Sequence, residues 1–219
     1  SNSIWLDKWL GELQVSYPAN SINTSSLKNS VFLESSKDLK SLKIPELKKE
    51  ISPIVFGCDN QINEIHAFAM FDYYYSKGGR VFDTAYIYNH GLSDKYLGDW
   101  INSRDLKDIV VLGKGAHTPD CLPDKIKPQI EESLSRGNID KLDIYCLHRD
   151  NVDVPVTEFI DALNECKKDG LIDVLGASNW ELERFKSAND YAEEQDKESF
   201  KVLSNNFSLA RMIEPVWPG

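Results

Sequence analysis

Short apolar segments alternate with longer segments of helical periodicity from residue 51 to residue 206. This alternation constrains the fold most, because apolar runs of strand length separated by helices of about 10 to 15 residues are typical of βαβ units and a parallel sheet. The sequence therefore predicts an α/β protein. The expected strands cover residues 53–58, 80–85, 108–114, 141–148, 172–178 and 200–206, and the expected helices cover about 63–78, 92–103, 124–137, 155–169 and 180–195.

The number of strand–helix units distinguishes two parallel-sheet architectures. An eight-unit barrel takes about 250 residues, so residues 51–219 stop about two units short of closure. Six units alone form an open doubly wound sheet, but a nucleotide site of that type requires a glycine-rich turn after its first strand, and residues 57–61, GCDNQ, are not one. Polar residues instead follow strand after strand, as they do at a barrel mouth. We predict a (β/α)8 TIM barrel over residues 51–219, preceded by an N-terminal extension.

Residues 1–50 differ in composition from the rest of the chain. Ile4, Trp5, Trp9 and Leu13 recur at helical spacing, whereas residues 16–36 are rich in Ser and Asn, which is typical of a loop. We interpret residues 1–50 as an N-terminal extension, either a docking arm or the tail of a preceding domain. Such an arm offers a route to self-association or to a partner domain.

Composition and charge exclude several classes of function. The net charge of −10 supplies no broad cationic surface for nucleic acid or an anionic membrane. No run of about 18 apolar residues and no signal peptide is found, so a membrane span is not expected. The four cysteines lack CxxC pairs and the spacing of a disulfide framework or zinc site, so we expect reduced thiols, a cytoplasmic location and no metal.

Four side chains with acid–base chemistry lie at the expected carboxyl ends of three successive strands. Asp83 and Tyr88 follow the second strand, Lys114 ends the third and His148 ends the fourth. A lysine ammonium beside a phenol favours the phenolate and lowers the phenol pKa, and an aspartate keeps that lysine charged. The imidazole supplies a hydrogen bond to a substrate oxygen or a proton relay. Together they describe a proton donor beside a carbonyl group.

The same residues belong to a longer series of motifs. FDTAYIYNHGLSDKYLGDWI, VVLGKGAH, DIYCLHRDN, DGLIDVLGASNW and NNFSLA, in this order and at these separations, resemble the aldo-keto reductases over residues 51–219. The resemblance implies an NADP(H)-dependent carbonyl reductase on a (β/α)8 barrel. It places Asp83, Tyr88, Lys114 and His148 in the catalytic tetrad of the family, with Tyr88 as the general acid that protonates a small-molecule aldehyde, ketone or sugar.

The resemblance also implies cofactor-binding residues. Ser178 and Asn179 match the pair that hydrogen-bonds the nicotinamide carboxamide, and an amide offers both the donor and the acceptor that this group needs. Where the family usually has glutamine on the sixth strand, this chain has Ser204, followed by Asn205. The stacking aromatic residue and the basic loop of the family belong to units beyond residue 219.

Other interpretations remain open at the level of sequence. Taken singly, Asp83 is an ordinary helix cap, Tyr88 a packing residue, Lys114 a solvated charge, and His148 a histidine satisfied by a neighbouring carboxylate. The barrel could also be a non-enzymatic binding or regulatory subunit, or an isomerase or lyase in which Lys114 forms a Schiff base. Further residues near the expected mouth are candidates for lining a substrate pocket. They are Asn89, His90, His117, Trp180 and Trp217.

Overall fold

Six short parallel strands and five α-helices alternate along the part of the chain that the structure, a computed structural model, describes, which is residues 41–206. The elements in order are β1 (Val55–Gly57), α3 (Glu64–Ser76), β2 (Val81–Asp83), the 3-10 helix η1 (Tyr88–Gly91), α4 (Leu92–Arg104), β3 (Val110–Gly115), α5 (Pro123–Gly137), β4 (Leu142–Leu147), α6 (Val156–Lys168), β5 (Ile172–Ser178), α7 (Leu182–Glu194) and β6 (Val202–Ser204).

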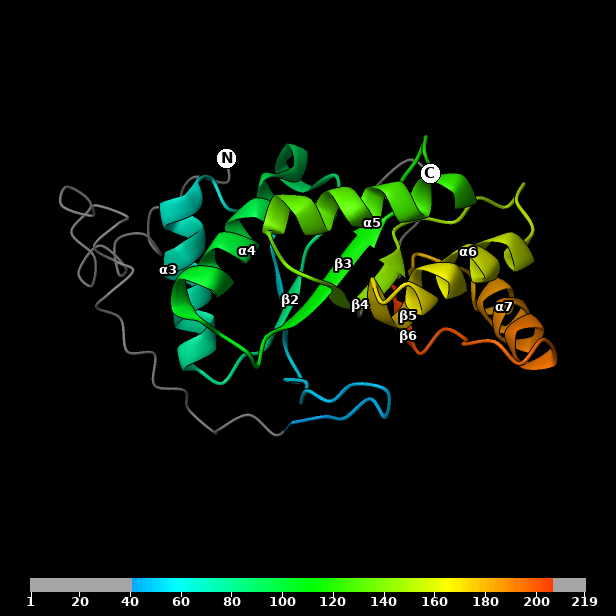
Figure 1. Cartoon of the computed structure of the whole chain (residues 1–219), viewed down its shortest axis with the longest axis horizontal. Coiled ribbons are helices and arrows are strands. Elements are labelled where there is room, and N and C mark those ends of the chain that lie inside the picture. Colours follow the sequence, from blue (N-terminus) through cyan, green and yellow to red (C-terminus); the bar gives the residue numbers. More distant parts are fainter. Residues whose placement is uncertain (1–40, 207–219) are drawn as a thin grey trace.

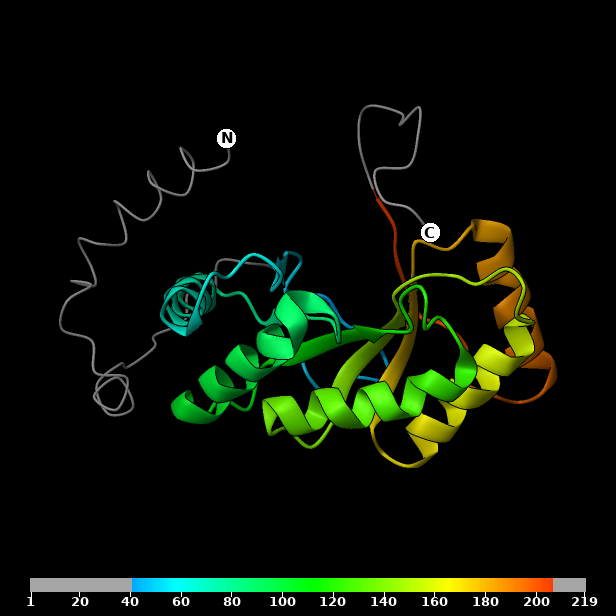
Figure 2. The same cartoon turned by 90° about the horizontal axis from the view of Figure 1, so that it is seen from above.

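The six strands form one parallel sheet in the order β1-β2-β3-β4-β5-β6. The sheet is curled, and α3 to α7 follow one another along its outer face (Figures 1 and 2). A doubly wound sheet would reverse its strand order and carry helices on both faces, and neither feature is present in residues 41–206. The prediction of six parallel strands and five intervening helices in a barrel-type arrangement is therefore confirmed.

Three strands are shorter than the sequence predicted: the inner strand β2, which covers Val81–Asp83 rather than residues 80–85, and the two edge strands. The ladder of β1 covers Val55–Gly57 rather than residues 53–58, and that of β6 covers Val202–Ser204 rather than residues 200–206. Each has a single neighbour in the described sheet, β2 and β5 respectively. Apolar composition marks a strand over its whole length, whereas the ladder extends only where a partner strand is opposite. The inner strands β3, β4 and β5 keep six or seven residues.

Apolar side chains fill both sides of the sheet. Between the sheet and the helices, rings of Phe71, Phe82 and Trp100 pack edge to face or at a tilt, with centroids 5.0 to 5.5 Å apart. On the concave side, Leu47 and Ile51 pack against strand residues that include Val110 and Ile144.

The segment that precedes β1 closes the end of the sheet where the strands begin. Leu42 and Ile51 form an antiparallel bridge, and Lys49 Nζ donates to a carboxylate oxygen of Asp143, near the start of β4, at 2.9 Å. Residues 41–50 are thus packed on the barrel core. The division at residue 50 into an extension and a barrel stays a prediction, and residues 1–40 lie outside the described range.

Two close contacts hold α3, α4 and α5 together. A Cβ on Gly98 of α4 would lie 1.8 Å from the carbonyl oxygen of Gly137 in α5, so the two helices approach at a distance that only glycine permits. Between α3 and α4, Asp72 accepts hydrogen bonds from Arg104 Nη2 at 3.0 Å and from Trp100 Nε1 at 2.7 Å. No helix within residues 41–206 has both the length and the apolar composition needed to cross a membrane.

Candidate active site

The four predicted catalytic side chains lie at the end of the sheet where the strands finish. Asp83 is the last residue of β2, Lys114 lies near the end of β3, and His148 directly follows β4. The parallel register pairs Asp83 with Leu112, two residues before Lys114, and pairs Lys114 with Cys146, two residues before His148. Lys114 and His148 therefore each lie two residues beyond the position that is paired with the functional residue of the previous strand. Because an offset of two residues keeps side chains on the same face, all three side chains lie toward one rim.

Lys114 links the acid and the phenol of this group. Its Nζ forms an ion pair with Asp83 Oδ1, and the Lys114 side chain is only 3% exposed. The same Nζ lies 4.9 Å from the centroid of the Tyr88 ring, over its face. A cation in this position is attracted by the negative face of the ring. Asp83, Lys114 and Tyr88 therefore form one contiguous set.

His148 completes the group on the other side of the phenol. The Tyr88 and His148 rings meet edge to face, with centroids 5.5 Å apart and an interplanar angle of 85°. A second imidazole, that of His117 in the loop after β3, packs on His148 at 4.8 Å and 80°. His148 Nδ1 is buried without a hydrogen-bond partner among the described residues.

A left-handed turn holds Tyr88 in place. Tyr88 opens η1, and the three residues after it all have positive φ angles, which are 48° at Asn89, 54° at His90 and 87° at Gly91. Arg136 of α5 supports this turn by donating from Nη1 to the carbonyl oxygen of Tyr86 at 2.8 Å. The φ angle of 87° at Gly91 favours glycine, and a Cβ there would also lie 2.5 Å from the Arg136 guanidinium, which would have to shift.

The electrostatics of the phenol differ from the sequence expectation. Burial raises the pKa of Tyr88 to about 12, and the negative charges near it, Asp59 first, raise it further, while Arg149 opposes them. The expectation that Lys114 lowers the Tyr88 pKa is therefore wrong for this structure, because desolvation of the phenolate outweighs the cations nearby. A phenol with this pKa stays protonated at neutral pH, which suits a proton donor rather than a base.

The two nitrogen bases are shifted downward. Burial lowers the pKa of His148 to about 3, and the charge of Lys114 adds to this effect, so the imidazole is neutral above that pH. Burial is also the main reason that the pKa of Lys114 falls to about 8, against the opposing effect of Cys146. At neutral pH the group therefore holds a neutral phenol, a neutral imidazole and a charged lysine.

These values predict the pH dependence of any reaction that uses Tyr88 as an acid. Between about pH 5 and 7 the charges of Tyr88, Lys114 and His148 do not change, so kcat/KM should be flat. Above about pH 8, kcat/KM should fall as Lys114 loses its proton. A pH profile of carbonyl reduction measures both. In Lys114→Arg, whose guanidinium keeps its charge, the alkaline fall should disappear. A tenfold rise per pH unit on acidification below about pH 6.5 would contradict a neutral His148.

The predicted cofactor-binding residues cluster at the ends of β5 and β6. Ser178 Oγ donates to the carbonyl oxygen of Ser204 at 2.8 Å, and Asn179 Nδ2 donates to the carbonyl oxygen of His148 at 3.2 Å. Asn205 Nδ2 donates to the carbonyl oxygen of Trp180 at 2.8 Å. Ser204 contributes its main chain to these bonds, and the amides of Asn179 and Asn205 are anchored through their nitrogens. Their assignment to a cofactor stays a prediction.

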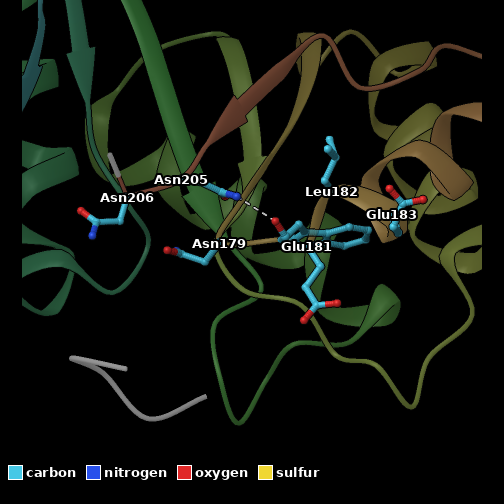
Figure 3. A pocket seen from close by; sticks show the side chains of 7 residues that line it. Asn179, Glu181, Leu182, Glu183, Asn205 and Asn206 are labelled. Carbon is cyan, nitrogen blue, oxygen red and sulfur yellow. Dashed lines mark hydrogen bonds between the residues drawn. The ribbon is translucent and has the colours of Figure 1, made fainter. Parts of the chain in front are cut away.

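An open pocket of about 580 Å³ adjoins these amides. Figure 3 shows the side chains that line it, with Asn205 bonded to the Trp180 main chain. The lining residues are Asn179, Trp180, Glu181, Leu182, Glu183, Asn205 and Asn206. The amide oxygens of Asn179 and Asn205 accept no hydrogen bond from residues 41–206, so they are available to the amide group of a ligand. These residues fit a nicotinamide carboxamide.

His117 and Trp180 were predicted only as candidates for lining a substrate pocket, and no role was predicted for Arg149. His117 lies against His148, and Trp180 Nε1 donates to the Arg149 carbonyl oxygen at 3.2 Å, so its ring is buried as packing. Arg149 is 9% exposed. The only sequence signal for its presence at the site is its position directly after His148, in an Arg-Asp pair. Trp217 lies outside the described residues. Within residues 41–206 no three His, Cys, Asp or Glu side chains are grouped closely enough to hold a metal ion.

Comparisons with known proteins agree with this arrangement. A sequence profile described as the Aldo/keto reductase family matches residues 54–216. The chain is 27% identical to a norsolorinic acid reductase B of Dothistroma septosporum over 191 residues, which are 76% of this chain and 48% of that protein. It is 26% identical to a putative aryl-alcohol dehydrogenase of Saccharomyces cerevisiae over 168 residues, 70% of this chain and 45% of the relative. An aldo-keto reductase of Aspergillus calidoustus is 29% identical over 164 residues, 68% and 41% of the two chains.

A curled parallel sheet with helices along its outer face is the architecture of part of a (β/α)8 barrel. The profile match covers most of the chain, and this protein belongs to the aldo/keto reductase family. The chain spans about half the length of the relatives it matches.

Proposed function

We propose that the protein is an NADP(H)-dependent oxidoreductase that interconverts a carbonyl compound, an aldehyde, ketone or sugar, and the corresponding alcohol. One observation carries the proposal: Asp83, Tyr88, Lys114 and His148, from three successive βα units, form one chain of contacts at the carboxyl rim of the sheet. The names of the relatives, which are reductases and an aryl-alcohol dehydrogenase, support the same class of reaction.

Each of the four side chains has a separate role in proton transfer. Tyr88 donates its hydroxyl proton to the carbonyl oxygen, and the phenolate that remains regains a proton from solvent. The neutral His148 donates a hydrogen bond that orients the same oxygen, and Lys114, held by Asp83, supplies positive charge beside the developing phenolate. When bound, the nicotinamide cofactor supplies the hydride that adds to the carbonyl carbon. Hydride and proton together give the alcohol.

Ser178 and Asn179 are proposed to hold the carboxamide of that cofactor, with Asn205 beside them and Ser204 positioning Ser178. The support is the open pocket at Asn179 and Asn205, whose amide oxygens face no described donor. A cofactor fixed there would lie next to His148, because the Asn179 amide is bonded to the His148 carbonyl oxygen. A preference for NADP(H), a cytoplasmic location and an absence of nucleic-acid or membrane partners stay predictions.

A cofactor titration combined with turnover tests this proposal. We expect the purified protein to quench NADPH fluorescence and to reduce members of a panel of aldehydes, ketones and sugars, with NADPH preferred over NADH. Asn179→Ala should raise the Kd for NADPH about three- to tenfold, the effect of one lost hydrogen bond. Asn102→Ala is a matched control, because this exposed amide of α4 bonds only to the Asn138 carbonyl oxygen among the described residues.

Two results would contradict the proposal in different ways. Binding of NADPH without turnover of any carbonyl compound would favour the alternative of a non-enzymatic binding or regulatory subunit. Equal effects of Asn179→Ala and Asn102→Ala on the Kd would remove Asn179 from the cofactor site while leaving the proton-transfer group untouched.

A further inference from the structure

Two cations at the carboxyl rim of the sheet are buried, and they differ in how they are neutralised. Lys114 is 4% exposed and is paired with Asp83. Arg149 is 9% exposed, yet no carboxylate of residues 41–206 lies within ion-pair distance of its guanidinium. A buried guanidinium without an anion is costly, because the desolvation of the charge is not compensated. The buried charge of Lys114 is thus compensated by Asp83, whereas the buried charge of Arg149 is not compensated by any residue of 41–206.

The hydrogen bonds of Arg149 are also incomplete. A guanidinium carries five N–H donors. The described residues accept one bond from it, a long one of 3.5 Å from Nη1 to the His148 carbonyl oxygen, and Nε is buried with no partner. The adjacent carboxylate, Asp150, is directed instead to Arg184, with Oδ2 2.5 Å from Arg184 Nε. The charge and most of the donors of Arg149 thus have no partner among residues 41–206.

The guanidinium is adjacent both to a residue of the proton-transfer group and to a residue of the open pocket. Arg149 Nη1 and Asn179 Nδ2 both donate to the carbonyl oxygen of His148, at 3.5 and 3.2 Å, and Asn179 lines the pocket. On the other side, the Tyr88 ring packs on His148, the residue directly before Arg149, with ring centroids 5.5 Å apart. The positive charge of Arg149 lowers the pKa of both groups. An anion bound at Arg149 would be near the carbonyl that Tyr88 protonates.

We propose that Arg149 binds a carboxylate of the substrate, so that the site prefers aldehydes or ketones that carry an acidic group near the carbonyl. This inference rests on the proposed function, since it names the class of substrate that the site takes. A guanidinium matches the geometry of a carboxylate through two parallel N–H bonds. The lining of the neighbouring pocket carries Glu181 and Glu183, so a single small carboxylate fits better than a group with several negative charges.

Paired substrates that differ only in charge test the inference. The ratio of kcat/KM for carboxybenzaldehyde to that for its neutral isostere nitrobenzaldehyde is measured with NADPH for the ortho, meta and para isomers. For the best isomer, Arg149→Gln should lower this ratio about ten- to hundredfold relative to the wild type, the effect of losing a charge-assisted pair. Arg149→Lys, which keeps the charge but loses the two parallel N–H bonds, should retain only part of the preference. Arg184→Gln is the matched control, because this arginine has its own carboxylate, and its ratio should equal that of the wild type.

A binding measurement separates this inference from the proposed function. Calorimetric titration of benzoate into the protein with NADPH present should show binding that weakens at least tenfold in Arg149→Gln and not in Arg184→Gln. Unchanged benzoate affinity and an unchanged ratio in Arg149→Gln would overturn the carboxylate site. A rise in the Kd for NADPH with no change for benzoate would also overturn it, by assigning Arg149 to the cofactor. Should no aldehyde be turned over, the proposed function fails, and the benzoate titration still decides whether Arg149 binds an anion.

Discussion

Replacement of Tyr88 by phenylalanine should lower kcat/KM for carbonyl reduction by about a hundred- to ten-thousandfold, the usual contribution of a positioned general acid. The phenol is the proton donor best placed for this role, because its ring lies against both Lys114 and His148, and its raised pKa of about 12 keeps it protonated at neutral pH. Phenylalanine preserves the ring contacts and removes only the hydroxyl. Steady-state kinetics with the best aldehyde of the panel and NADPH measures the loss.

A tyrosine two residues earlier provides the matched control. Tyr86 lies in the same loop, and its hydroxyl donates to Glu132 at the surface, at 2.8 Å. Tyr86→Phe should leave kcat/KM within about threefold of the wild type, and both variants should unfold at the same urea concentration as the wild type, because neither removes buried volume. Retained turnover in Tyr88→Phe would remove the tyrosine from the reaction and return Lys114 to consideration as the reactive group.

The arrangement of the units could be predicted because the sequence signal for it is local. Strand and helix periodicity along residues 51–206 indicates six βα units, and parallel strands whose ends share one rim must bring residues that follow them to one place. This is why Asp83, Lys114 and His148, which are far apart in sequence, could be expected to meet. The Asp83–Lys114 ion pair and the ring contact between Tyr88 and His148 have this origin.

Other properties of the site depend on burial, which the sequence does not encode at single positions. The pKa of Tyr88 was expected to fall because a lysine is nearby, whereas desolvation raises it. Arg149 follows His148 in sequence and reads as a surface residue, but its side chain is enclosed and lacks a carboxylate. The residue types of the left-handed turn, Asn89, His90 and Gly91, are compatible with positive φ angles. The support of this turn could not be predicted, because it comes from a distant residue, Arg136.

The largest effect on stability is expected from Asp72→Ala, which should lower the free energy of unfolding by about 3 to 5 kcal/mol, the usual cost of breaking a buried pair. The Asp72 and Arg104 side chains are 5% and 4% exposed, and their ion pair of 3.0 Å joins α3 to α4. The same carboxylate accepts the indole N–H of Trp100 at 2.7 Å, so its removal also leaves a buried donor without this acceptor. Urea unfolding followed by circular dichroism measures the change.

Two further variants isolate the burial of the charge as the cause. Asp99→Ala removes a carboxylate from an exposed pair with Lys95 on the outer side of α4, and it should cost less than about 1 kcal/mol because solvent screens that pair. The double variant Asp72→Leu, Arg104→Met replaces both charges with apolar groups and should recover much of the loss, since neither charge is then left without its partner. If Asp72→Ala and Asp99→Ala proved equally mild, the contact between α3 and α4 would depend on the aromatic packing of Phe71 on Trp100 rather than on the ion pair.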